Sequence, residues 1–179
     1  SAHNCAANST HIFILTDGSD FKVYKYKLDG AFLQNATTSA NLITSWGSGG
    51  TGSGQYMGYG SIIADETNVY ISSRDGSGIT KFDTSGNVIT HNGSPKIRQI
   101  YFNPTLKNTN GSEIFAWDFN TGQFKIYDTN LTELKTNAAS SSSGITAGDH
   151  GLSADSSGNI YISGYHNDYK VSKYKLTRN

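Results

Sequence analysis

The feature that most constrains the fold of this chain is an internal repeat of short β-type segments, with a period of roughly 45 residues. The clearest copies are residues 64–72 and 154–163, which both run from Ala-Asp through a polar turn into a Val/Ile-Tyr-Ile-Ser segment. A third copy lies halfway between them at residues 113–118. A fourth, at residues 11–16, precedes a polar, Gly-rich insert. A sheet unit of this length, repeated along one chain, is typical of a propeller blade.

Each unit has room for four strands separated by tight turns. Residues 22–28 alternate between polar and apolar side chains, as expected of a strand with one solvent-exposed face. The steps Asp29-Gly30 and Ser85-Gly86 supply the positive φ that hairpin turns need. The sequence therefore predicts an all-β fold, a β-propeller of four-stranded antiparallel blades. It forms one domain, with blades at approximately 1–46, 47–94, 95–144 and 145–179.

One segment resembles the NHL repeat. Residues 46–56 read Trp-Gly-Ser-Gly-Gly-Thr-Gly-Ser-Gly-Gln-Tyr, similar to the blade-ending Trp-Gly and Gly-rich segment of that family. Residues 60–83 match its continuation, a hydrophobic strand ending in Asp, a strand centred on Tyr, and Lys-Phe-Asp. The resemblance is good over residues 46–90, fair over 149–176 and weak elsewhere. The usual Pro is replaced by Met57-Gly58-Tyr59. The resemblance implies a propeller architecture and specifies no activity.

The strand count leaves the ring open to three interpretations. The fourth unit ends just after its third strand, while residues 2–7 suit either a poor inner strand of the first unit or the missing outer strand of the fourth. The chain could close as a small four-bladed ring or form a piece of a longer propeller. Alternatively, copies could assemble into a homo-oligomer through exposed strand edges.

Charge and composition limit the classes of binding partner that the chain is expected to have. The chain has 14 basic and 14 acidic residues, without the basic excess of a nucleic-acid binder. It contains no apolar run long enough to predict a membrane span. It begins at Ser1 rather than Met, which suggests processing or truncation. The single cysteine, Cys5, excludes a disulfide within this sequence. It is interpreted as a free thiol, an intermolecular bridge, half of a pair with a missing segment, or a small packed residue.

Five Asn-x-Ser/Thr sequons favour an extracellular or cell-surface glycoprotein. The candidate glycosylation sites are Asn8, Asn35, Asn92, Asn110 and Asn130.

The candidate ligand-binding face collects aromatic, cationic and histidine residues from loops expected to open on one side of the propeller. Exposed aromatic rings on such a face can stack on sugars or peptides. The predicted function is a non-catalytic module that binds protein or glycan, acts as a scaffold or assembles with itself. The predicted ligand-binding residues are Tyr56, Tyr59, Arg74, Arg98, His150, Tyr165 and His166.

The alternative is a lyase- or lactonase-type propeller enzyme with a metal on the axis, by similarity to propeller lyases that resemble NHL domains. The histidines show no ligand spacing, so neither a metal site nor a catalytic residue is predicted. No cofactor is expected, and calcium is the one ion that loops such as Asp17-Gly18-Ser19-Asp20 faintly suit. Four aspartates recur with the blade and are predicted to cap turns: Asp65, Asp83, Asp128 and Asp155.

Overall fold

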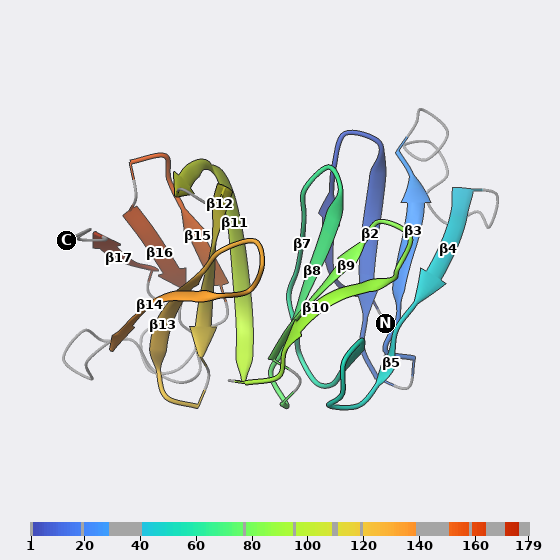
Figure 1. The fold of residues 1–179 in the computed structure, drawn as a ribbon, viewed down its shortest axis with the longest axis horizontal. Coiled ribbons are helices and arrows are strands. Elements are labelled where there is room, and N and C mark those ends of the chain that lie inside the picture. Colours follow the sequence, from blue (N-terminus) through green and yellow to red (C-terminus); the bar gives the residue numbers. More distant parts are fainter. Residues whose placement is uncertain are drawn as a thin grey trace.

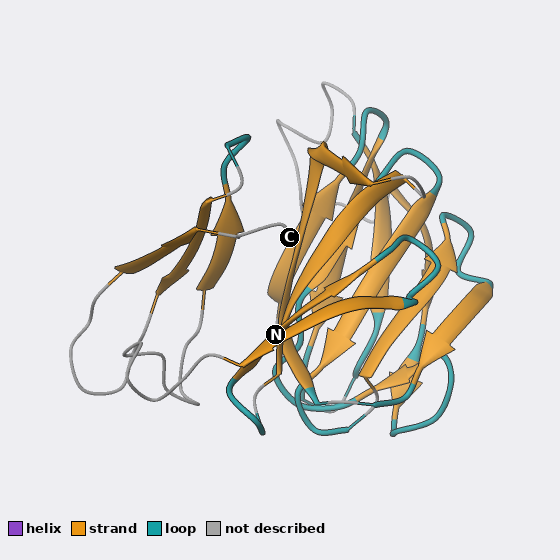
Figure 2. Ribbon diagram, turned by 60° about the vertical axis from the view of Figure 1, so that its left-hand side comes forward, coloured by secondary structure: helices purple, strands orange, loops and turns teal. Residues whose placement is uncertain are grey.

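The computed structural model describes residues 2–18, 20–28, 41–76, 78–94, 96–108, 111–118, 120–138, 151–157, 159–163 and 171–175. These residues form four antiparallel sheets in chain order, which we call the first to fourth sheets, and they contain no α-helix (Figure 1; Figure 2). The all-β propeller architecture with four-stranded antiparallel blades is therefore confirmed.

Strands that follow one another in sequence are neighbours in every sheet. The first sheet contains β1 (Ala2–Ala7), β2 (His11–Thr16), β3 (Val23–Lys27) and β4 (Leu42–Trp46). The second contains β7 (Ile62–Ala64), β8 (Asn68–Ser73), β9 (Gly78–Asp83) and β10 (Val88–Asn92). A short parallel pair, β5 (Ser48–Gly49) and β6 (Gln55–Tyr56), lies between these two sheets in the sequence.

The third sheet contains β11 (Ile97–Asn108), β12 (Gly111–Asp118), β13 (Gln123–Tyr127) and β14 (Glu133–Ala138). The fourth has three described strands, β15 (Gly151–Ala154), β16 (Asn159–Ser163) and β17 (Val171–Lys175).

The N-terminal segment has a definite place in this order. β1 pairs antiparallel with β2 and forms the inner strand of the first sheet. This segment is therefore not an outer strand of the fourth sheet, which was its alternative role.

The core is divided among the junctions between successive sheets, because side chains of a strand alternate between its two faces. In β8, Val69 and Ile71 pack toward the first sheet, whereas Tyr70 packs toward the third. The same alternation in β12 sends Ile114 toward the second sheet and Phe115 toward the fourth. A middle sheet thus buries both faces, which explains its continuous apolar strands.

The sheets follow one another as a series. The inner strands pack in the order β1, β7, β11 and β15. Among the described residues, no comparable packing joins the fourth sheet to the first. Figure 1 shows the first two sheets in one half of the molecule and the last two in the other.

The four recurring aspartates cap hairpin turns, as predicted. In each case one carboxylate oxygen accepts two backbone N–H groups of the turn, at distances of 2.7 to 3.0 Å. Such local bonds satisfy backbone donors that the sheet ladder leaves over. The four residues are Asp65, Asp83, Asp128 and Asp155.

Within the part of the chain that the structure describes, no helix has the length and apolar character needed to traverse a lipid bilayer.

Candidate functional site

A pocket of about 510 Å³ opens where the inner strands of the first and third sheets approach the loop that leads into β7. β1 contributes two lining residues, the loop one and β11 two, so the pocket joins segments distant in sequence. Among the described residues, the pocket is lined by His3, Asn4, Tyr59, Arg98 and Gln99.

Both pocket strands are irregular where they line it. The register of β1 against β2 shifts between Ala2 and Asn4, and that of β11 against β12 shifts between Ile97 and Gln99. A bulge of this kind re-aims side chains that a regular strand would send to alternate faces. Consecutive residues, His3 with Asn4 and Arg98 with Gln99, can therefore line the same space.

The loop that carries Tyr59 is held in place by close contacts with β8. Met57 donates its backbone N–H to Ser73 Oγ at 3.0 Å, and the same hydroxyl donates to the Met57 carbonyl at 2.7 Å. Gly60 passes so near β8 that an added Cβ would lie 2.2 Å from the Ser72 carbonyl oxygen. The backbone therefore requires glycine at this position to place Tyr59.

Tyr59 is the exposed aromatic group of the pocket, with 47% of its surface accessible. The Arg74 guanidinium carbon lies 4.8 Å from the centre of its ring, and the His3 ring lies 5.0 Å away in a tilted arrangement. A cation over an aromatic face is favourable and fixes the orientation of the ring.

Arg74 is itself positioned by Asp75 through two hydrogen bonds of 2.8 and 2.9 Å. This pairing raises the pKa of Arg74 and, reciprocally, lowers that of Asp75. Lys96 and Arg98 also lower the pKa of Asp75 through their positive charges. Arg98, which also lines the pocket, is only 6% exposed. Arg74, Lys96 and Arg98 therefore bring positive charge to the surroundings of the pocket, where Asp75 and Asp17 offset part of it.

The structure gathers part of the predicted ligand face. Tyr59 and Arg98 line the pocket, and Arg74 adjoins it through Tyr59. Tyr56 instead lies in the core between the first and second sheets, 3% exposed and edge-on to Phe21. Burial raises the pKa of its hydroxyl. The remaining predicted residues, His150, Tyr165 and His166, lie outside the described residues.

Sequence reasoning missed three lining residues, His3, Asn4 and Gln99. His3 and Asn4 belong to the segment whose place in the sheets was ambiguous. Gln99 follows Arg98 in a strand whose bulge has no sequence signature. The neighbouring Arg98 was the one signal that could have drawn attention to Gln99.

Side chains that could bind a metal do not cluster in the part of the chain that the structure describes. No group of three or more His, Cys, Asp or Glu residues that could hold a metal ion occurs within it. In the acidic loop considered for calcium, Asp17 lies 3.6 Å from the His3 ring and Asp20 accepts the Tyr24 hydroxyl.

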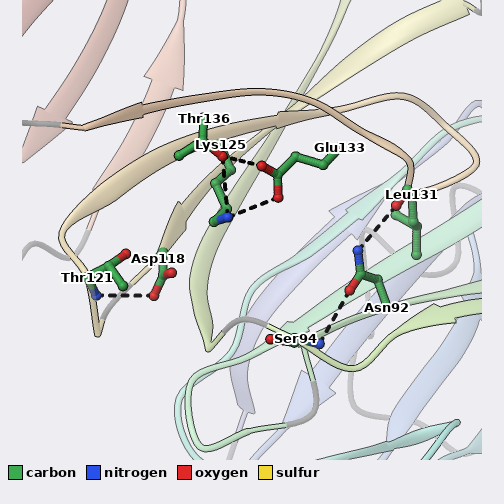
Figure 3. A network of polar contacts seen from close by, with 8 residues as sticks. All are labelled: Asn92, Ser94, Asp118, Thr121, Lys125, Leu131, Glu133 and Thr136. Atoms are coloured by element: carbon green, nitrogen blue, oxygen red, sulfur yellow. Dashed lines mark hydrogen bonds and ion pairs between the residues drawn. The ribbon is translucent and has the colours of Figure 1, made fainter.

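The described sequons differ in accessibility. The Asn8 side chain donates to the Asp65 carbonyl of the second sheet at 3.4 Å. Asn92 donates to the Leu131 carbonyl of the third sheet at 3.3 Å (Figure 3). Asn130, by contrast, is exposed at the turn between β13 and β14. Asn35 and Asn110 lie outside the described residues.

No protein-family model matches this sequence, and no curated protein matches it. Solved structures match it in fold. The computationally designed Ika4 protein is 10% identical, with 99% of this chain and 92% of that chain covered and a TM-score of 0.63. The periplasmic gluconolactonase of Pseudomonas aeruginosa is 11% identical, with 99% and 58% covered and a TM-score of 0.50. The chain spans less than two thirds of that gluconolactonase, and at such identity the likeness shows a propeller fold alone.

Proposed function

We propose that this chain is an extracellular, non-catalytic propeller module of NHL type, and that its pocket binds an acidic glycan. The observation that carries the proposal is an exposed aromatic residue, Tyr59, in a pocket that is also lined by the buried Arg98. The five sequons support an extracellular setting.

The Tyr59 ring supplies the stacking element of the site. Amphipathic rings bind the apolar faces of sugars and leave their own hydroxyl for water or ligand. Because Arg74 and the Ser73 bonds already hold the loop, little conformational entropy is lost when a sugar binds.

The polar groups of the pocket suit hydroxyl and carboxylate recognition. The amides of Asn4 and Gln99 both donate and accept, as sugar hydroxyls require. Guanidinium groups bind carboxylates with two parallel hydrogen bonds. None of the described lining residues is a carboxylate, so the wall does not repel an anion. A glycan that bears uronic acid groups fits these properties best.

The test compares hyaluronan oligosaccharides, which contain glucuronic acid, with the same fragments after reduction of their carboxyl groups to alcohols. Titration calorimetry should detect the acidic form, with at least tenfold weaker binding of the reduced form and a marked loss of affinity with salt. Tyr59→Ala should weaken binding at least tenfold. Leu134→Ala, a similarly exposed residue on β14, should leave it unchanged.

Absence of binding by hyaluronan, equal binding of the two forms, or full binding by Tyr59→Ala would overturn the glycan assignment. The same titrations, analysed for cleaved oligosaccharide, test the non-catalytic character. Product formed at a rate that depends on enzyme concentration and added metal would replace the proposal by the lyase or lactonase alternative.

A further inference from the structure

Each sheet directs an equivalent set of side chains toward the next sheet in the chain, and we call this set the forward face. In the first sheet it includes Leu15 and Val23, which pair across β2 and β3. The register between the second and third strands identifies the residues equivalent to this pair in the other sheets. They are Ser72 with Ile79, Trp117 with Phe124, and Ser163 with Val171. The forward faces are Phe13, Leu15 and Val23; Tyr70, Ser72 and Ile79; Phe115, Trp117 and Phe124; and Tyr161, Ser163 and Val171.

Burial separates the fourth forward face from the other three. The first three sets are no more than 6% exposed, because each packs into the junction with the following sheet. Val171 is 68% exposed, although its equivalents Val23 and Ile79 are 0% and 1% exposed. Lys173, which lies over the Tyr161 ring, is exposed as well, whereas its equivalent Lys81 is buried.

The opposite face of each sheet, the backward face, shows the complementary pattern. It carries apolar residues of the second strand and an aromatic residue of the third: Val69, Ile71 and Phe82; Ile114, Ala116 and Tyr127; and Ile160, Ile162 and Tyr174. In the first sheet, Ile12, Ile14 and Tyr26 occupy these positions. Ile12 and Ile14 are half-buried and belong to none of the three junction clusters of the described chain.

Cys5 belongs to this same backward face. It pairs with Ile14, as Ile62 pairs with Ile71, Ile100 with Ala116, and Leu152 with Ile162. The equivalents are apolar side chains packed in junctions, whereas Cys5 is exposed. A small apolar residue suits a surface that another sheet covers.

We propose that the forward face of the fourth sheet packs against the backward face of the first sheet in a second copy of this chain. A second copy is the partner because a forward face packs against a backward face three times within each chain, and a second copy offers both kinds of face. The described structure leaves the fourth and first sheets of one chain without such packing. Two copies joined head to tail through two equivalent junctions make a closed ring of eight sheets, within the range of known propellers.

The solution mass of the chain, measured by light scattering over a range of concentrations, tests this arrangement together with maleimide labelling of Cys5. The wild-type chain should have twice the 19.3 kDa mass of one copy and a protected Cys5. Val171→Asp should halve the mass and accelerate Cys5 labelling at least tenfold, although the two residues lie in different sheets. Ile89→Asp, a residue 52% exposed on the outer strand β10, is the matched control and should change neither.

A wild-type monomer overturns the assignment. If its Cys5 is protected and Val171→Asp exposes it, the two faces instead close within one chain. A dimer that Val171→Asp leaves intact also overturns it, because the contact then lies elsewhere. Since Val171 is exposed in the single chain, circular dichroism of the variant should match the wild type, which separates disassembly from unfolding.

Discussion

Tyr70 and Tyr161 donate equivalent hydrogen bonds, to Asp65 at 3.2 Å and to Asp155 at 2.9 Å, from the same position in the second and fourth sheets. Their surroundings differ, because Tyr70 is 0% exposed between two sheets and Tyr161 is half-buried. Position in the series, not local sequence, therefore determines how much of each ring is buried.

We predict that Tyr70→Ala lowers the free energy of unfolding by about 3–5 kcal/mol, because it leaves a cavity in a packed junction. Tyr161→Ala should cost about 1 kcal/mol at concentrations where the chain is monomeric. Urea denaturation of both variants provides the comparison, with Tyr70→Phe, expected to cost about 1 kcal/mol, isolating the hydroxyl. Equal losses for the two alanine variants would contradict the difference in burial.

Gly60→Ala tests the link between the backbone of the loop and the pocket. The added Cβ would lie 2.2 Å from the Ser72 carbonyl, so the loop must shift, at a cost of about 1–3 kcal/mol. We expect a lower melting temperature and weaker glycan binding, since Tyr59 adjoins the shifted residue. Gly122→Ala meets no atom within 4 Å and should affect stability through its positive φ, leaving binding unchanged. Unaltered stability of Gly60→Ala would contradict the close packing.

Acid should destabilise the chain through its turn aspartates. Hydrogen bonds from Asn87 lower the pKa of Asp83, and bonds from Asn159 lower that of Asp155 to about 2, against an ordinary 3.8. Because these pKa values are depressed in the folded state, their stabilisation is complete above pH 3.8 and disappears as the pH falls toward 2. The free energy of unfolding, measured by urea titration, should decline through this window. A free energy of unfolding that stays constant through this pH window would argue against stabilisation by the turn aspartates.

Glycan mapping after expression in a glycosylating secretory host should find Asn130 modified and Asn8 and Asn92 bare. The amide nitrogens of Asn8 and Asn92 contact neighbouring sheets, whereas Asn130 is exposed at its turn. Asn130→Gln should remove one glycan from the intact mass. Occupancy of Asn92 in folded protein would contradict its bond to Leu131, since the glycan is attached to the same nitrogen.

Much of the local structure follows from short-range rules. The β-branched and aromatic residues in 68–73 identify a strand, and its two faces follow because side chains of a strand project to opposite sides. The turn caps were predictable for a similar reason: Asp83 bonds to residues two and four positions further on. The burial of Tyr56 was harder to predict from the sequence, because the ring packs against Phe21 of a different segment.

By itself, the sequence determined the repeat, the strands, the turn aspartates and the all-β class, because these depend on side-chain alternation and on bonds between near neighbours. The tertiary structure alone decided that β1 is an inner strand of the first sheet, and that His3 meets Tyr59. It also decided which equivalent valine is buried and which exposed. Those outcomes depend on which sheet covers which face, and that information is spread over segments far apart in the chain.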